Sequence, residues 1–221
     1  MLRLTVVLAL VVAVGLAVPV FAGDIVDMPT GNMVAPNHAE FNYIFWDVDF
    51  GPSPAPQNIH IFEGFVGVTD WLELDGIVAS VDNDKTYARA NAYVRLLAER
   101  PDRPSLIVGA TNLTGADVPG GASDEPSPFF VSSYNIHVPA GPPSLKDPLI
   151  RMHFAWGTQY HGKTPFGGVQ MLITPKLGLA AFNYQGEGAY MAAYQINKMA
   201  CVRAGWKAND PFYSFGLNFN W

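Results

Sequence analysis

The serine and histidine side chains of this sequence are its candidates for nucleophilic chemistry. Acyl transfer needs a serine hydroxyl close to a histidine that can take its proton. His153 and His161 have no serine near them in the sequence, but pairing of two strands could bring Ser133 or His137 near Arg151 or His153. Neither a G-x-S-x-G motif nor an HExxH motif is present. We therefore predict a protein that is not an enzyme.

A second group of residues has side chains that can bind metal ions: His60, Glu63, Glu73 and Asp75. Transition-metal sites require such side chains to converge in a defined geometry, and this spacing matches no recognised site. Asp47 and Asp49 add two acids that share one face of a strand. The sequence therefore predicts a polar wall or rim, with no metal and no cofactor.

The remaining candidates are charged side chains on the less apolar face of extended segments. Charges on that face of a membrane barrel would line a water path or pair across the lumen. We expect the arginines to have Glu63, Glu73 and Asp75 as their counter-charges. The predicted lumen-lining residues are Glu63, Glu73, Asp75, Arg89, Arg95, Arg151, His153 and Arg203.

The elements that must position these residues are strands, because alternation of apolar and polar residues dominates the chain. Residues 86–100 have the Ala and Leu content of a helix, but their alternation is the better pattern and predicts a strand. The twelve predicted strands are 38–50, 57–68, 71–81, 85–98, 105–113, 128–138, 148–158, 167–174, 177–185, 189–196, 200–207 and 211–221.

The two faces of these strands favour a membrane barrel over a sandwich. In PLIRMHFAWGTQ, the residues Ile150, Met152, Phe154 and Trp156 share one face. The opposite faces are rich in small residues with an occasional Arg or His, which suits the confined inside of a barrel, while the bulky face would meet lipid. The tryptophans are typical of interface girdles, and stacking on sugar rings is the alternative.

The last strand, DPFYSFGLNFNW, carries the strongest membrane signal. A terminal aromatic residue preceded by alternating apolar residues resembles the sorting signal that the barrel-assembly machinery of bacterial outer membranes recognises. Such a strand would also close the barrel by pairing with the first strand. The predicted lipid-facing and assembly-signal residues are Phe154, Trp156, Tyr213, Phe215, Leu217, Phe219 and Trp221.

The connections and the N-terminus predict how the barrel is oriented in the membrane. Alternate connections are short, and the others are on average longer, which predicts periplasmic turns, external loops and both termini in the periplasm. Residues 4–21 follow Arg3 without a charge and end near Ala22, which predicts a signal peptide over 1–22; an uncleaved anchor is the alternative. A periplasmic lead-in over 23–37 and a single barrel over 38–221 would follow.

The composition of the chain excludes two kinds of feature, a nucleic-acid partner and structures built on paired or metal-binding cysteines. The net charge of −6 argues against nucleic acid as a partner. The lone Cys201 excludes an intramolecular disulfide and a cysteine-based zinc site. Lipid and the assembly machinery are the partners that a membrane barrel would meet.

Residues 103–221 carry four motifs: PSLIVGATNLTG (104–115), SSY (132–134), HFAWGTQYHGKTPFGGVQMLITPKLGLAAFNYQGE (153–187) and the final strand. With these motifs the segment resembles the C-terminal barrel of the YjbH-type family, outer-membrane proteins associated with exopolysaccharide production. Asn183 and Gln185 stand where that family usually has acids. The resemblance implies a barrel, with polysaccharide or export components as partners.

The sequence therefore predicts an all-β protein, an antiparallel up-and-down transmembrane β-barrel of about twelve strands in the bacterial outer membrane. Its predicted function is a porin-like narrow channel or an accessory to envelope or exopolysaccharide production or export. The alternative is a soluble periplasmic or secreted barrel that binds an apolar small molecule, which would require the bulky faces to point inward.

Overall fold

The computed structural model describes residues 32–48, 57–81, 85–116, 125–158, 161, 163–184 and 186–221. The predicted signal peptide (1–22) and residues 23–31 of the predicted lead-in lie outside this described part. Within it, no helix is both long enough and apolar enough to cross a membrane.

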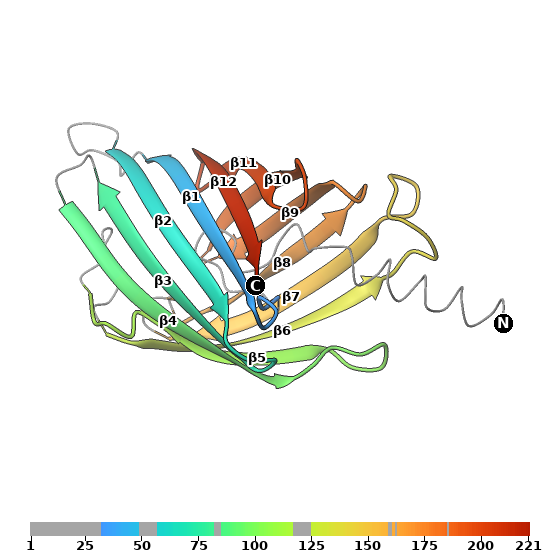
Figure 1. Cartoon of the computed structure of the whole chain (residues 1–221), viewed down its shortest axis with the longest axis horizontal. Coiled ribbons are helices and arrows are strands. Elements are labelled where there is room, and N and C mark those ends of the chain that lie inside the picture. The colour runs from blue at the N-terminus through green and yellow to red at the C-terminus, as the bar shows by residue number, and fades with distance from the viewer. Residues whose placement is uncertain are drawn as a thin grey trace.

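Twelve strands form a closed barrel (Figure 1). They are β1 (His38–Val48), β2 (Gln57–Gly67), β3 (Leu72–Val81), β4 (Lys85–Leu97), β5 (Ser105–Thr111), β6 (Ser127–His137), β7 (Leu149–Gly157), β8 (Pro165–Leu172), β9 (Leu177–Tyr184), β10 (Glu187–Gln195), β11 (Ala200–Lys207) and β12 (Asp210–Asn220). Each strand pairs antiparallel with its chain neighbours, and β1 pairs with β12 from His38↔Asn220 to Trp46↔Phe212. The predicted fold class, strand number and closure are confirmed.

Segment 86–100, which has the composition of a helix, contributes to β4 as its alternation predicted. Tyr93 on this strand is buried at 2% exposure, and its neighbours Val94 and Ala92 are half-buried. Pairing with β3 and β5 supplies the backbone hydrogen bonds that a helix would have made internally. Tertiary pairing therefore decides the conformation over helix propensity.

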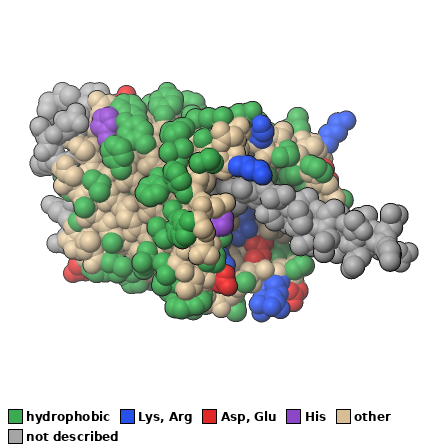
Figure 2. Space-filling model, in the orientation of Figure 1, with side chains coloured by type: hydrophobic (Ala, Val, Ile, Leu, Met, Phe, Trp, Pro, Cys, Tyr) green, Lys and Arg blue, Asp and Glu red, His purple; other side chains and the backbone are tan. Residues whose placement is uncertain are grey.

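The bulky apolar face of the strands points outward. Phe154, Tyr213 and Phe215 are 55%, 57% and 42% exposed, whereas alternate positions such as Ala155 and Phe212 are buried at 1%. Figure 2 shows hydrophobic side chains spread over the outer wall. Exposed aromatic rings in this number suit a wall that meets lipid. The soluble alternative required the bulky apolar faces to point inward, and the outward position of these rings favours the membrane barrel over it.

The connections do not separate into short and long sets by barrel end. We call the end at which β1 begins and β12 ends the terminal end, and the opposite one the distal end. The terminal end carries the connections 68–71, 98–104, 138–148, 173–176 and 196–199. The distal end carries 49–56, 82–84, 112–126, 158–164, 185–186 and 208–209. Short and long connections occur at both ends, so the predicted length asymmetry is not observed and gives no orientation.

Candidate functional site

The candidate site is the lumen, because the buried polar side chains lie on the inward faces of the strands. They concentrate in the half of the barrel next to the terminal end, and we call this group the polar belt. Its members are Glu40, Asn42, Glu63, Glu73, Asp75, Asn91, Ser105, Ser133, His153, Gln170 and Arg203. A ring of buried polar groups inside an apolar wall is an arrangement that suits the passage of polar solutes through a membrane.

The strongest contact of the polar belt joins three strands at the barrel seam. The Arg203 Nη2 atom donates to Glu40 Oε1 at 2.5 Å, and its Nη1 atom donates to Asn42 Oδ1 at 2.7 Å. Asn42 Nδ2 in turn donates to Glu63 Oε2 at 3.4 Å. Because β12 lies between β11 and β1, the arginine must pass across β12 to reach its partners.

Gly216 on β12 makes this crossing possible. A Cβ at this position would lie 2.7 Å from Asn42 Oδ1 and 3.3 Å from Arg203 Nη1. Any side chain there would therefore displace the guanidinium or the amide. Alternation placed this glycine on the inward face of the final strand, where Asn42 Oδ1, Cys201 Sγ (2.8 Å) and the guanidinium leave little room for a side chain.

Next to this seam group, Asp75 on β3 is held by residues of the neighbouring strand β4. Asn91 Nδ2 donates to Asp75 Oδ2 at 2.5 Å, and the Tyr93 hydroxyl lies 3.5 Å from the same oxygen. Asn91 Oδ1 accepts the backbone N–H of Asn112 at 2.9 Å, just beyond β5. A carboxylate oxygen held by donors in this way is fixed in place inside the lumen.

Ser133 and His153, which the sequence placed on adjacent strands, come together in the register Ser133↔His153. The serine Oγ and the histidine Nδ1 are 2.6 Å apart. This contact could be the nucleophile–base half of an acyl-transfer site, but the two residues are only 1% and 4% exposed. The ring also packs 6.0 Å from the Phe182 ring. A buried, packed pair of this kind is a satisfied structural contact, and the non-enzymatic function stays a prediction.

Sequence reasoning missed the role of His161, which follows the distal end of β7. His161 Nε2 lies 3.2 Å from Thr111 Oγ1, and its Nδ1 lies 3.0 Å from the Tyr184 hydroxyl. The ring stacks on Phe166 and meets Phe129 edge-on. Because His161 belongs to a connection, no strand alternation pointed to this position.

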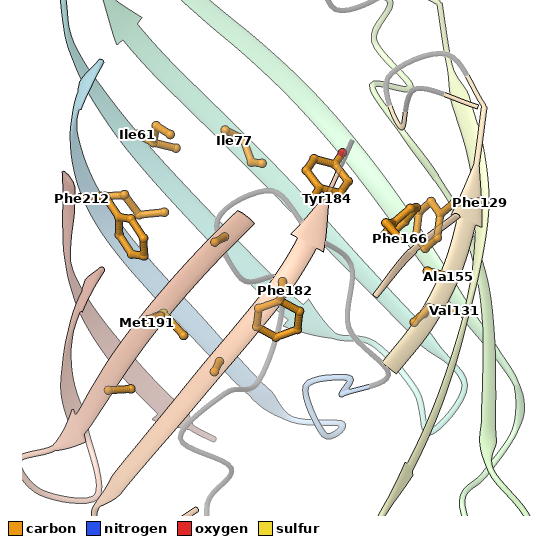
Figure 3. Packing of buried hydrophobic residues seen from close by; sticks show 14 of the residues in the cluster. Ile61, Ile77, Phe129, Val131, Ala155, Phe166, Phe182, Tyr184, Met191 and Phe212 are labelled. Atoms are coloured by element: carbon orange, nitrogen blue, oxygen red, sulfur yellow. The ribbon is translucent and has the colours of Figure 1, made fainter. Parts of the chain in front are cut away.

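An apolar cluster lines the distal half of the lumen (Figure 3). Ile61, Ile77, Phe182 and Phe212 point into this space from different strands. The large members of the cluster include Ile44, Val48, Ile59, Ile61, Ile77, Val81, Phe129, Phe166, Phe182, Tyr184, Met191 and Phe212. The sequence predicted a polar and small-residue interior; large apolar residues share it because inward side chains of a small barrel also pack against one another.

The predicted lumen residues differ in how deep they lie. Glu63, Glu73, Asp75, Arg89, His153 and Arg203 are inward and buried. Arg151 pairs with Glu99 of connection 98–104 at 2.8 Å. Arg95 donates to the Asp70 carbonyl at 3.0 Å and lies at the terminal rim.

Two ion pairs use acids that the sequence had not selected: Arg203 pairs with Glu40, and Arg151 pairs with Glu99. These side chains meet across the closed seam and at the rim, which strand alternation alone does not specify. The pairing of the arginines with Glu63, Glu73 and Asp75 stays a prediction.

The residues considered as metal ligands are not brought together. His60 lies on the outward face of β2, where its Nδ1 atom is 2.8 Å from the Tyr43 hydroxyl. Glu63, three positions along the same strand, faces inward. Asp47 is exposed, and Asp49 lies outside the described residues. No cluster of three or more ligand side chains occurs in the described part of the chain.

The residues before β1 also lie in the lumen, which the sequence did not indicate. We call residues 32–36 the crossbar. Asn32 Nδ2 donates to Gln170 Oε1 on β8 at 3.3 Å, and the Val34 N–H donates to Glu73 Oε2 on β3. Pro36 forms a parallel bridge with Gly67 at the end of β2. The crossbar therefore contacts the wall at well-separated strands.

No family model matches the chain, and no curated protein matches it. Among solved structures, the chain is similar to the KdgM porin, with 8% identity and a TM-score of 0.52, over 83% of this chain and 99% of that chain. It is also similar to the COG4313 outer membrane channel from Pseudomonas putida F1, with 11% identity and a TM-score of 0.43, over 84% and 96% of the two chains.

The likeness to the KdgM porin concerns the fold. The chain is a closed antiparallel β-barrel whose fold is similar to that of the KdgM porin. The more specific resemblance to the YjbH-type family stays a prediction from the sequence.

Proposed function

We propose that this protein is a narrow outer-membrane channel for small polar solutes. The observation that carries the proposal is the polar belt: buried carboxylates, amides and a guanidinium face inward, while large aromatic residues face outward. Polar groups are expensive to bury in a membrane protein unless they are paired or serve a polar pathway. A channel would explain why so many buried polar side chains lie at one level of the barrel.

The distribution of charge suggests which solutes would pass. Acids gather on β1, β2 and β3, at Glu40, Glu63, Glu73 and Asp75. Arg203 on β11 and Arg89 on β4 add cations beside this group, and Arg151 lies on β7, on the far side of the twelve-strand order from β1. A lumen that carries charges of both signs favours small dipolar or uncharged polar solutes, and its acids disfavour extended polyanions.

An accessory role in exopolysaccharide production or export is the finer form of this proposal. Its support is the sequence resemblance over residues 103–221. An outer-membrane location with both termini in the periplasm, and contact with lipid and the assembly machinery, belong to the same proposal. The porin-like fold supports the membrane part of it.

Solute flux into vesicles tests the channel. Protein refolded into liposomes should admit small neutral and zwitterionic solutes faster than protein-free liposomes, and should admit oligomeric polyanions no faster. A folded barrel is verified by heat-modifiable migration on a gel. Flux equal to that of empty liposomes for every solute, with the barrel folded, would reject the channel.

Two variants test whether the pathway of the solute runs through the lumen. Asp75→Asn lies in the polar belt, and Asp47→Asn changes an exposed acid on the outward side of β1. Removing the charge inside the lumen should raise the relative entry of small anions, whereas the outer change should leave solute preference unaltered. Equal effects of the two variants would place the pathway outside the lumen.

A further inference from the structure

The crossbar is a described part of the lumen that does not belong to a strand. It contacts the wall through a side-chain hydrogen bond to Gln170, a backbone hydrogen bond to Glu73 and the bridge to Gly67. Met33 between the two hydrogen-bonding residues is buried at 9% and joins the apolar cluster. Because the crossbar is not one of the twelve paired strands, it can leave without unpairing any of them.

The positions of these contacts show that the crossbar spans the lumen. β3 and β8 stand five places apart in the closed order of twelve strands, which is almost opposite. Glu73 is near the start of β3 and Gln170 near the end of β8, so both lie towards the terminal end. An extended chain advances about 3.3–3.6 Å per residue, so residues 32–36 are long enough to bridge much of this width.

A sharp turn directs the chain into the barrel. Asn37, immediately before β1, has φ 61°, in the left-handed region that Asn tolerates better than most residues. The His38 N–H donates to the Ala35 carbonyl at 3.2 Å across this turn, and the Trp221 N–H donates to the Asn37 carbonyl at 3.1 Å. The end of the final strand therefore fixes the turn from which the crossbar enters.

Gly67 supplies the docking place on the wall. A Cβ on this inward glycine would lie 2.1 Å from the Ala35 oxygen and 2.6 Å from the Val34 oxygen. The nearest atoms all belong to the crossbar, so a side chain at this position would displace the crossbar before anything else. The wall is thus shaped for the crossbar at the point where the crossbar enters.

We propose that the crossbar is a gate that closes the lumen at the polar belt and opens by leaving Glu73, Gln170 and Gly67. The inference rests on the proposed channel function. A polar solute would use the carboxylate and amide that the crossbar now occupies, so solute binding and crossbar docking compete. Release opens the polar half of the lumen while the twelve paired strands stay intact.

Two glycine variants test the gate in planar bilayers. Gly67→Ala should raise the mean conductance or the open fraction severalfold, because its methyl group excludes the Ala35 carbonyl. Gly76→Ala is the matched control on the next strand, since a Cβ there meets nothing within 4 Å. Heat-modifiable migration verifies folding of both variants. Wild-type conductance in a folded Gly67→Ala barrel would overturn the gate.

Crosslinking tests the position of the crossbar without relying on conductance. In a Cys201→Ser background, Asn32→Cys and Gln170→Cys together should be bridged by a short bifunctional thiol reagent in the folded barrel, and neither single variant should be. The bridged protein should then stay at its closed conductance even when Gly67→Ala is added. Absence of bridging would overturn the placement on which the gate depends.

The two measurements separate the gate from the channel. Bridging together with wild-type conductance that Gly67→Ala does not change would retain a channel and reject the gate. Bridging with no conductance in any folded variant would reject the channel, and the gate with it, and leave the crossbar as a structural brace.

Discussion

Arg203 on β11 donates to Glu40 on β1 at 2.5 Å, and the whole of β12 lies between the two strands. The side chains of the pair are 9% and 2% exposed. Two buried charges attract strongly, but they have also lost their hydration, so the net stabilisation from the pair is small while the cost of breaking it is large. The seam of the barrel therefore depends on both charges being present together.

Replacing Arg203 with leucine should destabilise the barrel by about 3–5 kcal/mol, because Glu40 would stay buried without its cation. Urea unfolding of the protein in lipid vesicles measures this change. Arg103→Leu is the control, since the Arg103 side chain donates to the Ala98 carbonyl in an exposed connection, and its loss should change stability by less than about 0.5 kcal/mol.

The double variant Arg203→Leu with Glu40→Leu removes both charges. It should recover much of the loss, because no charge is then left without a partner. A double variant as unstable as the single one would show that packing, rather than charge pairing, makes Arg203 necessary at the seam.

The outward face can be tested by introducing a charge in the middle of a strand. Phe215→Arg on β12 should cost about 2–4 kcal/mol in lipid vesicles, since Phe215 is an exposed aromatic far from either end of its strand. Leu97→Arg at the last residue of β4 is the depth control and should cost about 0–1 kcal/mol. Equal tolerance at both positions would mean that the wall does not cross a bilayer.

Sequence alone predicted the strands and their faces because both depend on local alternation. Phe215 and Phe154 were assigned outward and Asp75 inward from period two alone. The same pattern could not specify ion pairing: Arg203 and Glu40 are distant in the chain, and they meet only when β12 closes on β1. The geometry of closure, with its shear and tilt, is a property of the whole barrel.

The crossbar was missed for a related reason. Residues 32–36 carry no alternation. Beside the Asn32 side chain, they contact the wall through the Val34 N–H and through carbonyls that lie against Gly67, which has no side chain. Gly67 differs from other strand glycines only in that the backbone of the crossbar lies against it. Backbone contacts of this kind leave almost no trace in residue type, so a Pro- and Gly-rich lead-in looked like a linker.

The Ser133–His153 contact yields a prediction about chemistry. A fluorophosphonate probe should not label the folded protein, because Ser133 is 1% exposed inside the barrel. Ser133→Ala should lower stability by about 1–3 kcal/mol, since His153 would lose a buried hydrogen-bond partner. Ser132→Ala, on the outward side of the same strand, is the control and should have little effect. Labelling that disappears in Ser133→Ala would instead show a reactive nucleophile and an enzyme.

Trp221 should matter more for assembly than for the folded barrel. Its side chain is 69% exposed, and its backbone N–H bonds to Asn37, so the indole ring contributes little packing within the chain. Even complete burial of such a ring at the membrane interface is worth only about 1.5–3 kcal/mol. Trp221→Ala should therefore strongly reduce the amount of protein in the outer membrane, while the refolded protein loses at most about 1.5–3 kcal/mol of stability.

Trp206→Ala, at an outward position within β11, is the control and should leave membrane levels much closer to normal. Unchanged membrane levels for Trp221→Ala would mean that the final strand closes the barrel without serving as a signal for the assembly machinery.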